Sequence, residues 1–345
     1  MDTIESRLLT NHDTIITDIT YTIDKFGIIK PSIKIDPPIE IGVIFQDSGK
    51  KHIFNQSLIH TDFRSFNNPE NTGINSKIKI FKNIVKNQDL SANNLISDIS
   101  IELCEDTPKF DKPLLIDKCP ICNSQLKNYN GIYICNNAKC KTQIFGKCHH
   151  FLRHMGIRLH GIYFQIFCTL IARGIIEDQS DIFKIFEKEV FESIDTIKNT
   201  QREIYYKLIY DSIQPKVNMI KFLKALNIIP NIEESDGIEK FVKNIQENYS
   251  EANITNIYLF IENIINDFAI IIDENTDDTI SVFDQLTKLS HDDINKLSEK
   301  FGNIQLYEIA SIIDYIWNTN NKNMLNKFNI YFSTPMDDIL KKIYA

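Results

Sequence analysis

The chain has 345 residues, of which 43% are hydrophobic and 24% charged, which excludes an intrinsically disordered protein and predicts two or three folded domains. It has no apolar run near the roughly 20 residues of a membrane span, and its acidic, polar start is not expected to act as a secretory signal. We therefore expect no membrane partner and an intracellular location: cytoplasm, nucleoid or, for a viral source, host cytoplasm.

The formal net charge of −8 does not by itself indicate a nucleic-acid-binding protein. The charge is uneven: it is about −1 for residues 1–140, about +4 for 141–230 and about −11 for 231–345. Because Lys and Arg attract phosphates, we expect any phosphate-contacting surface just after residue 140. The acidic C-terminal third is expected to be solvated or to contact protein.

Residues 14–104 have the pattern of short β-strands. Alternating or apolar runs lie at residues 14–24, 28–35, 39–45, 77–84 and 94–103. Turn-forming residues follow the first three runs, at residues 24–27, 36–38 and 47–50. About five short strands with tight turns predict a small barrel, of which the oligonucleotide-binding (OB) type is one option. Residues 105–118, with two prolines and several charges, are predicted to be a linker.

The most specific motif is C-x2-C-x12-C-x4-C, formed by Cys119, Cys122, Cys135 and Cys140. Two close pairs of thiols, separated by enough chain for a hairpin, match the ligands of a tetrahedral zinc. A chance cluster or disulfides are the alternative, which the lack of a secretory context disfavours. Since all four positions are cysteine, no coordination position stays open, and the zinc is expected to be structural. Cys104, Cys148 and Cys168 are expected to be ordinary thiols.

From about residue 145 the hydrophobic period becomes helical. Candidate helices lie at residues 162–176, 180–194, 203–213, 217–228, 238–249, 257–272, 281–289, 291–301 and 307–317. They predict an all-α array of short helices. The histidines at 149, 150, 154 and 160 lack an acidic partner at helical spacing, so we favour a polar or phosphate-contacting face over a metal site.

The order of a β-barrel (1–104), a linker with zinc module (105–145) and a helical domain (146–345) resembles the C-terminal half of NAD-dependent DNA ligases. That half combines an OB-fold, a four-cysteine zinc finger and a helix-hairpin-helix domain. Residues 18–31, DITYTIDKFGIIKP, follow the family pattern D-I-x-x-Q-V-G-R-T-G-x-x-x-P without a gap. Cys119-Pro120-Ile121-Cys122 matches its C-P-x-C, and residues 150–176 match its H-F…G-L-G…G-L-V. The resemblance covers roughly residues 10–335 and is divergent; a viral source is one option.

The resemblance implies double-stranded or nicked DNA as a partner, contacted through the backbone. The residues that it implicates are Lys25, Lys30, Lys141, Lys147, Arg153, Arg158 and Gly161. Lys25 replaces the family's arginine, and the hairpin keeps Gly161 but has Tyr163 at its second glycine. The family's nucleophilic lysine motif K-x-D-G is absent from the sequence. We therefore expect no catalytic residue, no NAD site and no autonomous activity.

Three functions remain open. In the first, the chain is a non-catalytic DNA-binding or scaffolding subunit that derives from such a ligase and acts in replication or repair. Alternatively, it completes a split NAD-dependent ligase whose adenylation domain is on another chain. The third hypothesis is a scaffold that binds other replication proteins without contacting DNA.

Overall fold

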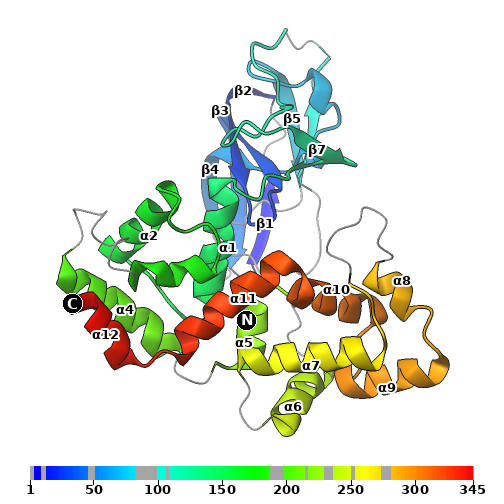
Figure 1. Ribbon diagram of the computed structural model, residues 1–345. Helices are drawn as coiled ribbons and strands as arrows, with labels where there is room; N and C mark the ends of the chain where they lie inside the picture. The colour runs from blue at the N-terminus through cyan, green and yellow to red at the C-terminus, as the bar shows by residue number, and fades with distance from the viewer. Residues whose placement is uncertain are drawn as a thin grey trace. The chain divides into compact units, whose positions relative to one another are not determined.

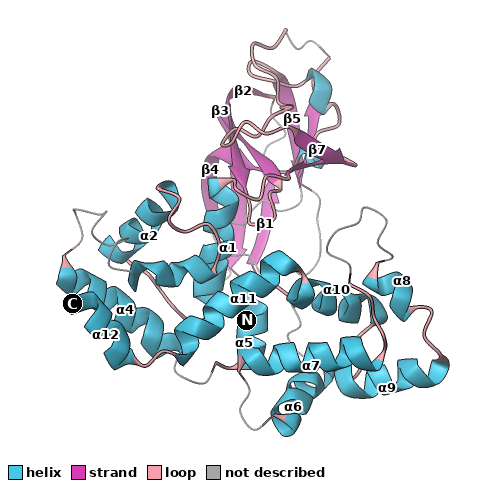
Figure 2. Cartoon of the chain, in the orientation of Figure 1, coloured by secondary structure: helices cyan, strands magenta, loops and turns pink. Residues whose placement is uncertain are grey.

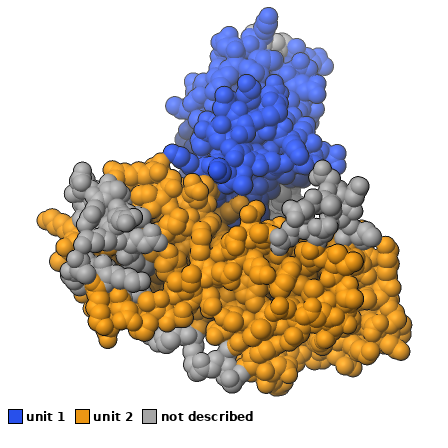
Figure 3. Space-filling view, viewed as in Figure 1, with its two compact units in different colours: residues 1–143 blue, residues 144–345 orange. Residues whose placement is uncertain are grey.

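The computed structural model describes residues 4–8, 13–45, 51–82, 99–105, 109–186, 198–213, 217–228, 236–249, 253–272 and 281–344. The chain has an α+β architecture and divides into two compact units, residues 1–143 and 144–345 (Figure 3). The predicted domain boundaries, at residues 104 and 145, stay predictions. Among the described residues, no helix combines the length and apolar character needed to cross a membrane.

The first unit is built on an antiparallel sheet (Figures 1 and 2). Its strands are β1 (Ile4–Leu8), β2 (Thr14–Ile23), β3 (Ile29–Phe45), β4 (Lys51–His60), β5 (Lys77–Lys82) and β6 (Ile99–Leu103). The order is β1-β3-β2-β5-β6, and β4 also pairs with β3. Two short 3-10 helices, η1 (Phe63–Ser65) and η2 (Pro69–Asn71), follow β4. Just after η1, Phe66 forms a parallel bridge with Ile101 of β6.

The predicted turn at Asp36-Pro37-Pro38 is wrong, because β3 continues through it. Asp36 still pairs with Ile15 of β2, while the pairing with β4 is interrupted between Lys34 and Ile39. Prolines cannot donate to a ladder and are tolerated where pairing is irregular. The two predicted strands are therefore one long strand. The predicted turn at 47–50 lies outside the described residues.

The core of the first unit is made largely of isoleucine side chains from these strands. On β2 the buried face changes from Thr14 and Ile16 to Ile19 and Ile23, because the register with β3 shifts between Ile16 and Asp18. A bulge of this kind inserts one residue and reverses the alternation beyond it. The apolar pattern of the strand is thus preserved on one side of the sheet.

The segment predicted as a linker packs on this unit, in so far as residues 109–118 are described. The Leu114 N–H donates to the carbonyl of Thr72 at 2.8 Å, and the Ile74 N–H donates to the carbonyl of Lys112 at 2.9 Å. The Leu114 side chain is fully buried, and its carbonyl accepts a hydrogen bond from the Tyr21 hydroxyl at 2.8 Å. This fixed path holds the first cysteine pair beside the sheet.

Most of the predicted helices are confirmed, with shifted ends (Figure 2). The helices are α1 (Lys141–His154), α2 (Ile162–Ala172), α4 (Asn199–Ile213), α5 (Met219–Ala225), α6 (Asp236–Asn248), α7 (Ile254–Asp267), α8 (Val282–Leu286), α9 (His291–Phe301), α10 (Leu306–Trp317), α11 (Thr319–Ser333) and α12 (Met336–Tyr344). The predicted helix at 180–194 is, where described, a 3-10 helix, η3 (Ser180–Phe186). Helices α1, α11 and α12 were not among the predicted helices.

An aromatic cluster anchors α1 in the core of the second unit. The ring of Phe151 on α1 lies 5.1 Å from that of Phe328 on α11, and Phe222 on α5 meets Phe328 edge-on at 5.4 Å. All three side chains are fully buried. Such aromatic pairs each add about 0.5–1.5 kcal/mol beyond burial. They therefore fix the end of α1, from which the loop to α2 departs.

Candidate metal centre and basic pocket

The four cysteines of the motif meet at one point in the first unit, with their Sγ atoms all within 4.8 Å of one another. They form two pairs, Cys119 with Cys122 and Cys135 with Cys140, and we call the short segment that carries each pair a knuckle. The hairpin of β7 (Leu126–Tyr129) and β8 (Ile132–Cys135) connects the two knuckles. Asn130 and Gly131 form its two-residue turn, both with positive φ, as the favoured type I′ hairpin turn requires. The loop between the cysteine pairs is therefore the small hairpin that its length allows.

The sulfur geometry fits a tetrahedral metal. The Sγ atoms of Cys122 and Cys135 are 3.5 Å apart, and those of Cys119 and Cys140 are 4.0 Å apart. Zinc–thiolate bonds of about 2.3 Å place tetrahedral sulfurs about 3.8 Å apart, whereas a disulfide requires about 2.05 Å. All four cysteines are free thiols. The set could therefore hold a metal, and the disulfide alternative is absent from this cluster.

The cysteines of the two knuckles differ in the pKa of their thiols. Burial acts to raise the pKa of Cys122, but hydrogen bonds from Ser124 and Asn137 outweigh it and lower that pKa to about 6. Burial raises the pKa of Cys135 to about 12, and burial also raises the pKa of Cys140. The Sγ atoms of Cys122 and Cys135 also form a hydrogen bond in which either sulfur could be the donor. A bound dication must displace these protons, so metal binding is expected to weaken in acid.

Side chains next to the cysteines fix the two knuckles to each other. The Asn137 amide donates to the Ser124 hydroxyl at 3.2 Å, and Ser124 lies two residues after Cys122. The Gln143 amide, on the first turn of α1, donates to the carbonyl of Cys135 at 2.5 Å. The hairpin, both knuckles and the start of α1 therefore form one hydrogen-bonded module.

Gly27 joins this module to the sheet. Its carbonyl accepts a hydrogen bond from the Cys135 N–H at 2.9 Å, and its φ is +83°. A Cβ at this position would lie 2.7 Å from the Gln143 amide nitrogen and would also overlap the Cys135 carbonyl. Neither contact can relax easily, because both groups belong to the hydrogen-bonded module. Glycine is thus required by backbone conformation and by close packing.

Gly27→Ala is expected to destabilise the first unit by about 3 kcal/mol or more, since left-handed backbone strain and overpacking add. Chemical denaturation followed by circular dichroism measures this loss. Gly131→Ala is the matched control: φ there is +84°, but among the described residues the added Cβ meets only the side chain of Arg64, which is 58% exposed, and no backbone atom. It should cost about 1–2 kcal/mol. Equal losses for the two variants would contradict the close approach at Gly27.

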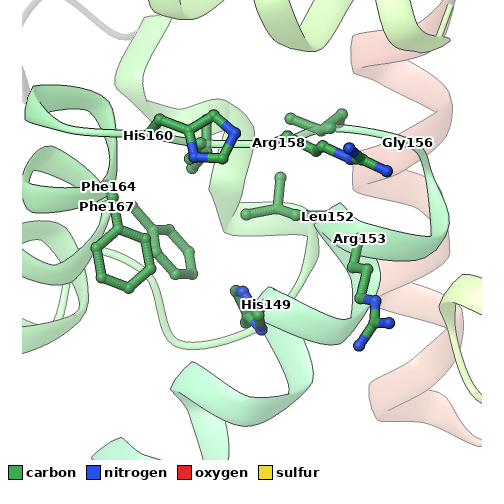
Figure 4. Close-up of a pocket in the computed structure, with 10 residues that line it drawn as sticks. His149, Leu152, Arg153, Gly156, Arg158, His160, Phe164 and Phe167 are labelled. Atoms are coloured by element: carbon green, nitrogen blue, oxygen red, sulfur yellow. The ribbon is translucent and has the colours of Figure 1, made fainter. Parts of the chain in front are cut away.

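The second unit contains a basic pocket of about 770 Å³ at the connection between α1 and α2 (Figure 4). His149 and Arg153 line it from α1, and Arg158 and His160 line it from the connecting loop. Both arginines are exposed, and neither guanidinium has an ion-pair or hydrogen-bond partner among the described residues. None of the ten described residues that line it carries a carboxylate. Such a pocket is suited to an anion.

The loop backbone beside this pocket is open. Gly161 is the N-cap of α2 with φ of +57°, and a Cβ built there would meet nothing within 4 Å. Tyr163, at the position where the second hairpin glycine was expected, is half-buried and its ring lies 6.5 Å from that of Tyr205 on α4. By contrast, Gly302 after α9 lies against Gly237 of α6. A Cβ added at Gly302 would lie only 2.9 Å from the Gly237 Cα. Gly302 therefore serves helix packing.

In a comparison with known proteins, the similar sequences are DNA ligases. No protein-family model matches the sequence. The chain is 27% identical to a DNA ligase of Rickettsia prowazekii over 218 residues, which are 61% of this chain and 29% of that ligase. It is 24% identical to a DNA ligase of Leuconostoc citreum over 191 residues (54% and 24%) and 30% identical to one of Phocaeicola vulgatus over 83 residues (23% and 12%).

The chain is a distant relative of DNA ligases. It spans less than a third of the length of these three relatives. This similarity supports a ligase-derived protein, in agreement with the resemblance found in the sequence motifs.

The basic residues implicated by the ligase resemblance fall into separate groups. Arg153 and Arg158 meet at the pocket, beside which Gly161 caps α2. Lys25 lies in the turn after β2, with its Nζ 4.9 Å from the Phe26 ring centre, and burial lowers its pKa. Lys30 is exposed on β3. Lys141 is the exposed first residue of α1, and Lys147 is half-buried on the same helix.

Sequence reasoning did not identify the pocket itself. His149 and His160 were predicted only as members of a polar or phosphate-contacting face, and Phe164 and Phe167 only as part of the candidate helix at residues 162–176. The signal that could have found the pocket is the run HHFLRHMGIRLHG at residues 149–161, where cations at helical spacing lead into a glycine-flanked loop.

Proposed function

We propose that these 345 residues are ligase-derived and bind duplex DNA through the phosphate backbone. The observation that carries this proposal is a pair of guanidinium groups, Arg153 and Arg158, that have no partner among the described residues. They lie at the pocket beside the open backbone of Gly161. Arginine and accessible backbone N–H groups are the usual phosphate contacts of DNA-binding proteins. The 345 residues contain no K-x-D-G motif, so we assign no adenylation step to this sequence.

The strand pairing supports an OB-type barrel as the second DNA-facing element. Strands β2 to β6 are linked by antiparallel pairs β2–β3, β3–β4, β2–β5 and β5–β6. The parallel bridge from Phe66 to Ile101 then connects the chain after β4 back to β6. A five-stranded, partly open barrel of this kind is a common oligonucleotide-binding module. Lys25 and Lys30 would contact phosphates from this barrel.

We assign zinc as the metal of the four-cysteine site. Four thiolates with sulfur separations near 3.8 Å suit a tetrahedral d¹⁰ ion, and no ligand position stays open for a substrate. The zinc would hold the hairpin, the start of α1 and the turn at Gly27 together. Exposed Lys118, Lys139 and Lys141 nearby in sequence would partly offset the negative charge of the tetrathiolate. The site is structural in this proposal, and the α1–α2 connection is the proposed helix-hairpin-helix element.

Retention of labelled DNA on a filter tests the binding proposal. The full chain is expected to retain both nicked and intact 30-bp duplexes at low salt and to release them as salt rises, because the contacts are electrostatic. No retention of either duplex at low salt would contradict the proposal. A scaffold without DNA contact, the third function considered from the sequence, predicts that negative result.

A second candidate is a subunit of a split NAD-dependent ligase. The similarity to DNA ligases favours it. Mixing the chain with an adenylation-domain chain of a NAD-dependent ligase should then increase nick sealing and AMP transfer. Unchanged rates of both reactions would rule this candidate out.

A further inference from the structure

The basic pocket has an aromatic side as well as a cationic one. Its residues Phe164 and Phe167 lie on one side in Figure 4, and the guanidinium groups of Arg153 and Arg158 lie on the other. His149 completes the aromatic side, with its ring 6.4 Å from that of Phe164 in an edge-on arrangement. A phosphate contact alone would need only the cationic side. The aromatic side therefore indicates a ligand that also has a flat, apolar part.

The aromatic side is held rigidly. The His149 ring stacks on Phe145 at 5.7 Å with planes 6° apart, and Phe164 meets Phe145 edge-on at 6.0 Å. Phe167 is fully buried beneath them. His149 itself is exposed, so a ligand in the pocket can reach its ring. Preorganised rings lose little entropy when a planar group packs against them.

The size of the pocket fits one nucleotide. Its volume of about 770 Å³ lies within the roughly 300–1,000 Å³ of pockets that enclose a small organic molecule. A paired duplex presents phosphates to a protein surface but keeps its bases stacked inside. A single unpaired nucleotide presents both a phosphate and an accessible base face, because every base stacks on aromatic side chains.

We propose that this pocket accepts one unpaired nucleotide of bound DNA, with its base against His149 and Phe164 and its phosphate against Arg153 and Arg158. The proposal rests on the proposed duplex binding and assigns this site a preference for DNA in which one nucleotide leaves the helix. No covalent step is involved.

Fluorescence anisotropy with the full chain tests this preference. Two labelled duplexes of equal length are compared at one salt concentration: one is fully paired, and the other carries a single-nucleotide bulge. The bulged duplex should bind at least about five-fold more tightly, the lower end of base–aromatic stacking effects. In His149→Ala the ratio of the two affinities should fall towards one. If that variant does not fold, His149→Asn gives the same readout.

The matched control is Lys243→Ala, which removes a cation that is 70% exposed on α6 and should leave the ratio unchanged. Equal affinities of the unaltered chain for both duplexes would overturn the nucleotide pocket while leaving duplex binding intact. Loss of binding to both duplexes would instead overturn the proposed function. Tight binding of free deoxyadenosine monophosphate without any preference between the duplexes would also overturn the proposal, because the pocket would then serve a free nucleotide.

Discussion

Cys135→Ser is expected to abolish metal binding and to destabilise the first unit by more than about 4 kcal/mol, the range in which loss of a structural metal falls. Cys135 is nearly fully buried, its N–H donates to Gly27, and its carbonyl accepts from Gln143. Loss of this ligand removes the link between the hairpin, the sheet and α1. Elemental analysis and denaturation measure the two effects.

Cys168→Ser is the control for thiol loss, because Cys168 is a half-buried cysteine on α2 in the other unit and its side chain holds no part of the cluster. It should retain the metal content of the unaltered chain, which we expect to be about one zinc per chain. A fully metal-loaded Cys135→Ser variant would contradict the four-thiolate site. So would an unaltered chain that binds no zinc under reducing conditions.

The double variant Arg153→Gln with Arg158→Gln is expected to weaken duplex binding by about ten- to a hundred-fold at low salt. Each lost phosphate contact should reduce the slope of log affinity against log salt by about 0.9, so the two together should reduce it by about 1.8. Glutamine keeps much of the side-chain length while removing the charge. Lys243→Ala again provides the control. An unchanged slope in the double variant would show that these arginines do not contact phosphates.

The metal cluster could be predicted because its signal is local. The cysteines lie within 22 residues, and the turn Asn130-Gly131 between them specifies a tight hairpin. Sequence spacing therefore determines most of the ligand geometry. The connection from Gly27 to Cys135 was beyond such reasoning, because it joins residues more than a hundred positions apart.

Strand β4 was missed because its sequence does not alternate. Ile53, Phe54 and Leu58 are 59%, 45% and 44% exposed, so apolar residues occur on both faces, and Ile59 is the buried one. Helix α11 was missed for a similar reason. It is rich in asparagine, a weak helix former, and its buried side chains are Met324, Leu325 and Phe328. Tertiary packing decides both elements.

The basic pocket could not be predicted from the sequence, because tertiary structure alone brings its residues together. Its residues come from α1, the loop after it and α2, and the path of that loop decides which of them face one cavity. The sequence placed positive charge in residues 141–230, which include this pocket. The sequence could not show that Arg153 and Arg158 line the same pocket. Nor could it show that Lys141 and Lys147, which lie in the same basic region, are not among the residues that line it.

The salt dependence of duplex binding by the full chain tests the central claim most directly. Affinity for a 30-bp duplex should be measured by anisotropy between about 50 and 200 mM salt. A ligase-derived chain that uses several backbone contacts predicts a steep linear fall of log affinity with log salt, with a slope of about −2 or steeper. Absence of binding at 50 mM, or an affinity that does not change with salt, would contradict DNA binding through these residues.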